Sequence, residues 1–249
     1  MKYAFMATMI ATSISILSTN AMAADIHKAA RKGDTDKVQE LITSGADISE
    51  LDKAVGAPLH WAAARGHVEV ARELVAAGAD TSQESHAPDL LTPLHLAASG
   101  GHLSVVKLLV ENGAILNAGE GAVGTPLHSA AQNDRDEVIA YLLDAGADSE
   151  AKATAGAYGV YPIHYAAAAG ASNAILALLE NGAEINSKND RTGVTALHLA
   201  VFNAHPEAAV ILLEAGADPH AVSTNIETPA ALAKYHKELK EVFLEAGVN

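Results

Sequence analysis

One short motif recurs along almost the whole chain and limits its fold more than any other feature. Each copy carries a histidine at its fourth position, and the copies are Ala57-Pro-Leu-His60, Thr92-Pro-Leu-His95, Thr125-Pro-Leu-His128, Tyr161-Pro-Ile-His164 and Thr195-Ala-Leu-His198. Consecutive histidines are 35, 33, 36 and 34 residues apart. Because self-similarity at such a period is the signature of repeat architectures, the sequence predicts a stack of similar units.

A second motif keeps the same period. A Gly-Ala pair, usually followed by Asp or Glu, begins 18 residues after each motif histidine and after His27, at Gly45, Gly78, Gly113, Gly146, Gly182 and Gly216. Apolar runs such as 105–110 precede it. The pattern indicates two helices per unit, followed by a polar turn that leads to the next unit.

The residue types within a unit indicate where its helices begin and end. We expect the Thr hydroxyl at the first motif position to cap the first helix by accepting a hydrogen bond from a backbone N–H. Pro suits the first helical turn, where no donor is missed. Glycines such as Gly66 end the first helix, and the Gly of Gly-Ala-Asp follows the second, where a left-handed residue is favoured. No single unit can bury both helices, so the units must stack.

Together, the two motifs and their period resemble those of the ankyrin repeat family, over essentially the whole chain after residue 23. The resemblance implies an all-α solenoid of about seven helix-turn-helix units with projecting hairpin fingers. We expect one such domain over 24–249, with units near 25–49, 50–82, 88–117, 121–150, 157–186, 191–220 and 224–249. The first and last units are expected to be caps. The first carries Lys28 after its histidine and the last, from Thr228, lacks the histidine.

Residues 1–23 differ from the repeats and are typical of a secretion signal. Lys2 is their only charge, an apolar stretch follows to Leu17, and Ala21 and Ala23 fit a signal-peptidase site. We expect cleavage after Ala23, and therefore an exported bacterial protein, periplasmic or secreted, with no membrane anchor. The apolar stretch is shorter than the about 20 residues of a comfortable span. An uncleaved anchor is the alternative.

Charge and composition exclude several classes of function. The formal net charge is −14, which would repel a phosphate backbone, so we expect no nucleic-acid partner. The chain has no cysteine, which excludes a disulfide framework, a zinc–thiolate site and a thiol nucleophile. A basic protein surface would be attracted, although the same acids also keep a helical surface soluble.

The histidines invite a metal hypothesis that the repeat argues against. In the ankyrin family the motif histidine is structural, its ring bonding across the turn and between adjacent repeats. Successive copies would lie about 10 Å apart, whereas zinc needs ligands at about 2 Å. We therefore expect structural roles for His27, His60, His95, His128, His164 and His198, and no cofactor or metal. Gly119-Glu-Gly121-Ala-Val-Gly124 matches a dinucleotide pattern, but no strand precedes it, and no catalytic motif is present, so we expect no enzyme.

A partner would bind where the repeats differ from one another. The resemblance implies a concave surface made of fingers and first helices, and the variable positions on it can give specificity. The expected partner-binding residues are Arg65, Leu91, Gln132, Asn133, Tyr158, Arg191, Phe202 and Asn203. Of these we expect Tyr158, Arg191 and Phe202 to form one contact patch, since aromatic and Arg side chains are the usual interface anchors.

These observations predict a monomeric protein–protein interaction module in an exported compartment. Among exported ankyrin proteins, the resemblance implies three narrower roles as alternatives: an immunity protein that neutralises a secreted toxin, an accessory factor in peroxide defence, and an effector delivered to a host. An enzyme or haem binder and a self-associating structural stack are the other classes considered. The sequence does not name the partner.

Overall fold

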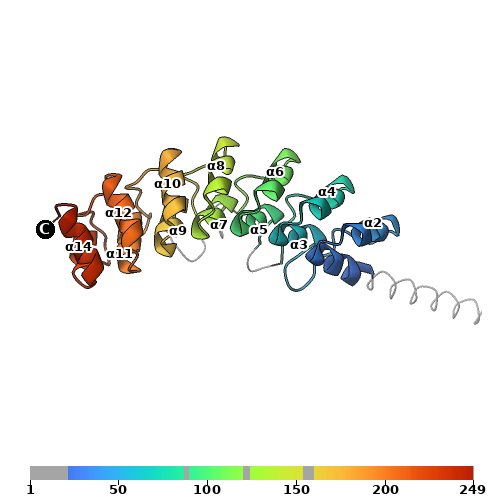
Figure 1. Ribbon diagram of the computed structural model, residues 1–249, viewed down its shortest axis with the longest axis horizontal. Coiled ribbons are helices and arrows are strands. Elements are labelled where there is room, and N and C mark those ends of the chain that lie inside the picture. The colour runs from blue at the N-terminus through green and yellow to red at the C-terminus, as the bar shows by residue number, and fades with distance from the viewer. Residues whose placement is uncertain (1–21, 87–89, 120–123, 154–159, 249) are drawn as a thin grey trace, which may run out of the picture.

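A row of paired α-helices makes up the protein in the computed structural model, which describes residues 22–86, 90–119, 124–153 and 160–248 (Figure 1). A helix over residues 22–32 pairs with α2 (Thr35–Thr43). The following pairs are α3 (Pro58–Arg65) with α4 (Val68–Ala76), α5 (Pro93–Gly100) with α6 (Leu103–Glu111), α7 (Pro126–Gln132) with α8 (Asp136–Asp144), α9 (Pro162–Ala169) with α10 (Ser172–Glu180), α11 (Ala196–Phe202) with α12 (Pro206–Glu214), and α13 (Pro229–Ala233) with α14 (Lys237–Glu245). The predicted all-α solenoid of about seven units is confirmed.

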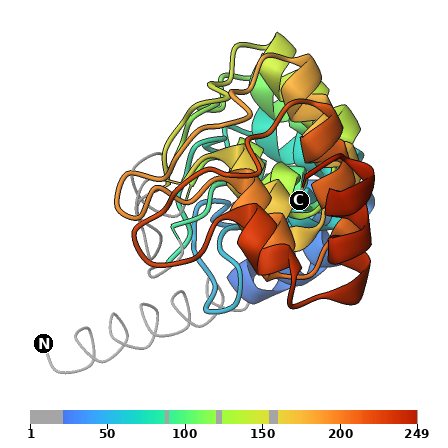
Figure 2. The ribbon, with the colours of Figure 1, turned by 90° about the vertical axis from the view of Figure 1, so that its left-hand side faces the viewer.

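The helices form two layers, and the connections between units project to one side of them. The first helices of consecutive units pack side by side, and the second helices form the other layer (Figure 1). Figure 2 shows the long connections gathered on one side of the stack. Within the described residues, the connections contain one isolated antiparallel bridge, between Ala153 and Val160, and no longer strand. The fingers are therefore mostly irregular loops.

The starts of the first helices differ from the prediction in one respect. At Thr92 and Thr125 the hydroxyl does not accept from the backbone; its oxygen lies 2.9 and 3.0 Å from Nδ1 of His95 and His128. The expected cap is present at Thr195, whose hydroxyl accepts from the His198 N–H at 3.5 Å and also lies 2.8 Å from Nδ1 of His198, and at Thr228, whose hydroxyl accepts from the Ala231 N–H at 3.3 Å.

The helix ends follow the glycine pattern. Gly66 closes α3 at φ 72° and Gly78 follows α4 at φ 92°, in the left-handed region that favours glycine. At the end of the first helix glycine is also required for space. A Cβ on Gly66 would lie 2.6 Å from Nδ1 of His102 in the next unit. This contact couples the end of α3 to the unit that follows it.

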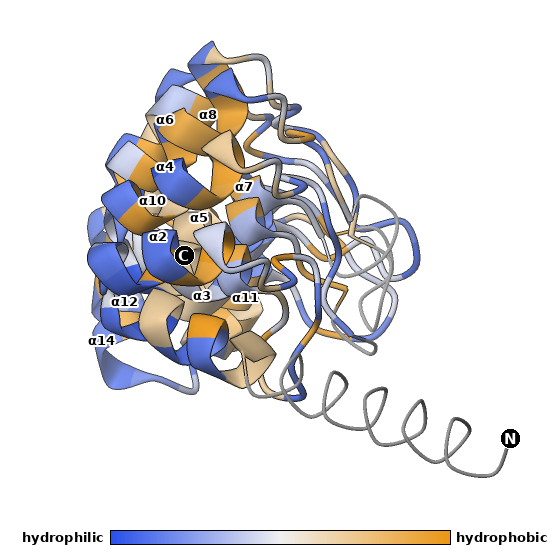
Figure 3. Ribbon diagram, turned by 90° about the vertical axis from the view of Figure 1, so that its right-hand side faces the viewer, coloured by the Kyte–Doolittle hydropathy of each residue, from blue (hydrophilic) through white to orange (hydrophobic). Residues whose placement is uncertain are grey.

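The core runs the length of the stack between the two layers. Alanine pairs on the first helices, such as Ala97 and Ala98, are fully buried, and so are larger aliphatics of the second helices such as Leu109 and Ile139. Small side chains let neighbouring helices approach closely, while aliphatic side chains supply most of the buried apolar area. Figure 3 colours much of α2 and α14 as hydrophilic, as expected for helices with one face in solvent.

The N-terminal region contains the predicted cap unit and the end of the predicted signal. Lys28 is exposed on the first helix, as a polar cap requires. The signal prediction falls mostly on residues 1–21, which lie outside the described residues. The first helix continues through the expected cleavage point, where Ala23 is buried and its carbonyl oxygen accepts a hydrogen bond from Nδ1 of His27 at 2.6 Å. Of the helices described here, none has the length and apolarity to cross a membrane.

Candidate interaction surface

The motif histidines join each unit to the next. In four units Nε2 donates to a carbonyl oxygen just before the next first helix, at Leu91, Gly124, Val160 and Val194, over 2.9–3.1 Å. Nδ1 accepts the backbone N–H three residues earlier in the motif, at 3.0–3.4 Å. Because that N–H can only donate, these bonds define a neutral ring protonated on Nε2. The inter-repeat bonds expected of the motif histidines are present at His60, His95, His128 and His164.

The two terminal histidines of the series depart from this pattern. His27 places Nδ1 and Nε2 against two carbonyl oxygens, those of Ala23 and Glu50, at 2.6 and 2.8 Å. At His198 the expected bond to the next unit is absent, because its buried Nε2 has no hydrogen-bond partner in the described part of the chain. The Ala221 carbonyl oxygen is close enough to raise the pKa of the ring, but it does not meet the geometry of a hydrogen bond. The next unit is the cap, whose α13 has only 5 residues.

Burial keeps these rings neutral. Desolvation lowers the pKa of His60, His128, His164 and His198 to about 4, against only partial compensation from nearby backbone carbonyls. It also lowers the pKa of His95. In the described ranges, no three His, Asp or Glu side chains are grouped so that they could hold a metal ion. The motif histidines are accordingly scaffold, and the binding surface has to be sought beside them.

A cavity of about 340 Å³ lies on the face formed by the first helices and fingers. We call it the inner-helix groove, and it is lined by Gln132, Val160, His164, Tyr165, Ala168, Ala169, Asn189 and Leu199. These residues come from α7, α9, α11 and the two fingers between them. Its walls are mostly apolar, which is usual for a ligand-binding cavity.

The polar groups of the groove are few and uncharged. In the described residues, the Gln132 amide, the Tyr165 hydroxyl and Nδ2 of Asn189 have no hydrogen-bond partner, so they can bond to a ligand. Burial raises the pKa of Tyr165 above its usual 10.0, which keeps the hydroxyl protonated. The ring of Tyr165 packs edge-on against His128 at 5.1 Å and is thereby held in place. The groove thus combines an apolar floor with three hydrogen-bonding groups.

The structure brings some of the predicted partner-binding residues together. Gln132 lines the groove. Phe202 is 60% exposed at the end of α11, and that end is tied to the groove by the Asn203 amide, which donates to the Ala168 carbonyl at 3.1 Å. Arg191 lies exposed in the same finger as Asn189. Gln132 thus lines the groove itself, whereas Phe202 and Arg191 lie on the helix and the finger that contribute Leu199 and Asn189 to it.

Other predicted residues lie elsewhere or serve the scaffold. Arg65 is exposed at the end of α3, toward the N-terminal end of the stack, and Tyr158 lies outside the described residues. The Asn133 amide donates to Ser99 Oγ and to the Ser129 carbonyl, so it supports the stacking of α5 and α7. Leu91 is half-buried, and its carbonyl oxygen accepts from His60.

Sequence reasoning missed most residues of the groove, among them Tyr165, Leu199 and Asn189. Tyr165 and Leu199 directly follow a motif histidine, at a position that is Trp, Leu, Ser, Tyr and Leu in the five motif copies. That variability was the available signal, because scaffold positions repeat and recognition positions do not. Asn189, in the finger before α11, carried no comparable signal.

Comparisons with known proteins agree with this architecture. Residues 26–119, 77–153 and 149–223 match the family described as "Ankyrin repeats (3 copies)". The crystal structure of the human ASB11 ankyrin repeat domain superposes with a TM-score of 0.77 at 24% identity, covering 89% of this chain and 96% of that one. The chain therefore belongs to the ankyrin repeat family, whose repeats are protein–protein interaction modules built on a typically non-catalytic scaffold.

Curated relatives match this chain over only a small part of their own length. The nuclear factor NF-kappa-B p105 subunit of Gallus gallus is 30% identical over 122 residues, which is 49% of this chain and 12% of that protein. Ankyrin repeat domain-containing protein 40 of Mus musculus is 34% identical over 77 residues, 31% of this chain and 21% of that protein. The chain thus spans about a fifth or less of these relatives' lengths.

Proposed function

We propose that this chain is a protein-binding module that holds an apolar side chain of its partner in the inner-helix groove. The observation that carries the proposal is the largely apolar lining of the groove, with three uncharged hydrogen-bonding groups around it. Removing the partner's apolar side chain from water supplies binding free energy, at about 25 cal/mol per Å². The amides of Gln132 and Asn189 and the Tyr165 hydroxyl would orient the adjoining peptide groups.

The exposed ring of Phe202 supports this assignment. An aromatic ring that is 60% exposed at the edge of an apolar groove is a usual binding anchor. We place Phe202 and Arg191 at the rim of the contact region, with Phe202 on apolar surface of the partner and Arg191 on its polar surface. The groove itself carries no charged side chain among its lining residues, so recognition at its centre depends on shape and hydrogen bonding.

The proposal includes a compartment and a class of partner. The signal-like residues 1–23 support export of a bacterial chain, to the periplasm or beyond, as a monomer. Cleavage would be tested by the N-terminal sequence of the protein recovered from the exported fraction, and the monomer by its mass in solution. The net charge of −14 favours a basic partner such as a secreted toxin over an acidic one. No observation on the molecule favours a role in peroxide defence.

A matched pair of alanines tests the groove. Ala169 is the exposed last residue of α9 in the groove, and Ala76 is the exposed last residue of α4 in the other layer. We expect Ala169→Arg to block the groove and weaken binding at least about tenfold, whereas Ala76→Arg leaves it unchanged. The binding protein is first captured from the native exported fraction and identified, and its affinity for each purified variant is then measured by calorimetry. Equal affinity for the two variants would exclude the groove as the docking site.

A further inference from the structure

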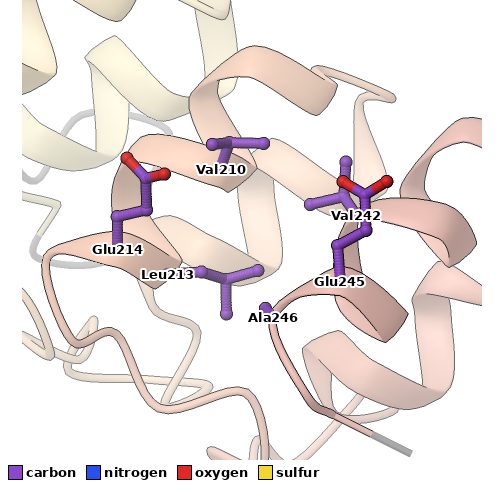
Figure 4. A pocket seen from close by; sticks show the side chains of 6 residues that line it. All are labelled: Val210, Leu213, Glu214, Val242, Glu245 and Ala246. Carbon is purple, nitrogen blue, oxygen red and sulfur yellow. The ribbon is translucent and has the colours of Figure 1, made fainter.

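A second cavity lies between the second helices of the last two units, away from the inner-helix groove (Figure 4). Its volume is about 320 Å³. We call it the α12–α14 groove, and it is lined by Val210, Leu213, Glu214, Val242, Glu245 and Ala246. Val210, Leu213 and Val242 are half-buried, and the two glutamates are exposed. Figure 4 shows one carboxylate on each side of the apolar side chains.

The two glutamates make this groove strongly negative. Glu214 is the last residue of α12 and Glu245 the last residue of α14, and neither helix has a basic residue in its last turn. The C-terminal end of a helix carries a partial negative charge from its unpaired carbonyls, which adds to each carboxylate. Neither carboxylate forms an ion pair with any residue that the structure describes. Two like charges therefore flank an apolar surface with no counter-charge beside them.

We propose that the α12–α14 groove binds an arginine side chain of a protein partner. The three-carbon stem would cover Val210, Leu213 and Val242, and the guanidinium would lie between the two carboxylates. Arginine suits both parts, because its stem buries readily along apolar surface while its head stays polar, and its guanidinium presents five donors. A volume of about 320 Å³ is at the small end for ligand cavities, which favours one side chain over a larger ligand.

The chain offers a control for general electrostatic attraction. Glu111 and Glu180 are the exposed last residues of α6 and α10, so they share the helix-end position of Glu214 and Glu245. Neither of them lines the α12–α14 groove. Neutralising the control pair removes the same charge from the chain as neutralising the groove pair. A difference between the two double variants would therefore come from the groove.

The experiment measures binding of a blocked Ala-Ala-Arg-Ala-Ala peptide to the full ¹⁵N-labelled chain by NMR titration. We expect chemical-shift changes in the amides of residues 210–215 and 242–247, and a dissociation constant in the millimolar range that rises with salt. A matching peptide with citrulline, the uncharged analogue of arginine, should bind about tenfold more weakly. Glu214→Gln with Glu245→Gln should weaken binding about tenfold, and Glu111→Gln with Glu180→Gln less than twofold. Ala246→Leu, which fills the groove at unchanged charge, should also weaken it.

Several outcomes would overturn the proposal. Equal binding of the citrulline peptide would show that the charge is not recognised. An equal effect of the two double variants would show that the peptide is attracted by the net charge of the chain and not by the groove. Tighter binding of the matching lysine peptide would show that the groove prefers an ammonium group to a guanidinium. These outcomes are independent of the inner-helix groove, because its test variant, Ala169→Arg, lies in α9 and changes neither α12 nor α14.

Discussion

Asp134 and Ala171 occupy, as a pair, positions that are glycine and histidine in several other units. In those units the histidine of the following unit lies over the glycine and bonds back to a first-helix carbonyl, as His205 does to Ala168 at 3.1 Å. Here Asp134, at φ 58°, instead sends its carboxylate forward to the Ala174 N–H, at 2.8 Å, and to the Asn173 amide, at 2.9 Å. The contact between α7 and α10 is kept by a different set of atoms.

This exchange predicts that the two positions are energetically coupled. Ala171→His alone should be destabilising, because its ring would meet the Cβ of Asp134; a Cβ on Gly170 would lie 2.6 Å from the His205 ring. Asp134→Gly alone loses two hydrogen bonds. The double variant restores the arrangement of the other units, so we expect a favourable coupling free energy of about 0.5–3 kcal/mol in a urea-denaturation cycle. Additive effects would show that the positions are independent.

Replacing a motif histidine should cost stability according to the partners that it leaves behind. His164→Ala strands the Val194 carbonyl and the Tyr161 N–H, and we expect the free energy of unfolding to fall by about 1–3 kcal/mol. His198→Ala strands the Thr195 N–H but no carbonyl, so the loss should be smaller. Urea denaturation of both variants makes the comparison. A larger loss at position 198 would contradict the observed bonding.

The buried histidines predict a loss of stability in mild acid. The folded-state pKa of His60, His128, His164 and His198 is about 4, against an ordinary 6.5. Between these values the unfolded chain takes up protons that the folded chain does not. Each ring then lowers the free energy of unfolding, by up to about 3 kcal/mol, as pH falls from 6.5 to 4, with no further loss below.

Denaturation at a series of pH values checks this expectation. His164→Ala serves as the control, and its free energy of unfolding should depend less steeply on pH in the same window. Asp52 acts in a lower window: three backbone N–H groups and the Trp61 indole hold its pKa at about 2, so its contribution is lost as pH falls from 3.8 through that value. A constant free energy between pH 6.5 and 4.5 would contradict the neutral assignment of the histidines.

Ala204 is a site where one substitution should stabilise the protein. It closes the first helix of its unit at φ 58°, where a Cβ is unfavourable, whereas Gly66 and Gly170 hold the same position at φ 72° and 69°. We expect Ala204→Gly to raise the free energy of unfolding by about 0.5–1 kcal/mol, after the greater backbone entropy of glycine in the unfolded chain is subtracted. Ala145→Gly, at φ −76°, is the control and should not stabilise. Equal changes in urea midpoint would show that Ala204 is unstrained.

Sequence reasoning succeeded where every unit obeys the same rule. The helix endings at Gly66 and Gly78, the buried alanine pairs and the inter-repeat bonds of four histidines follow from one motif repeated in register. It failed where a neighbouring side chain or the end of the stack changes the bonding. The Thr92 hydroxyl turns to His95 and not to the backbone, and His198 lacks its carbonyl because the cap follows it. In both cases a competing or missing neighbour decided the bond.

By itself, the sequence determined the solenoid, the number of its units and the scaffold role of the histidines, because periodic burial and helix termination act within a unit and between neighbours. Only the tertiary structure decided which variable side chains meet. Gln132, Tyr165 and Leu199 lie about one unit apart in the chain and converge only when α7, α9 and α11 stack. Val210 and Val242 likewise form one groove only because α12 packs beside α14. A repeat motif is the same in every unit, whereas a groove is made from the differences between units at the distance set by helix packing.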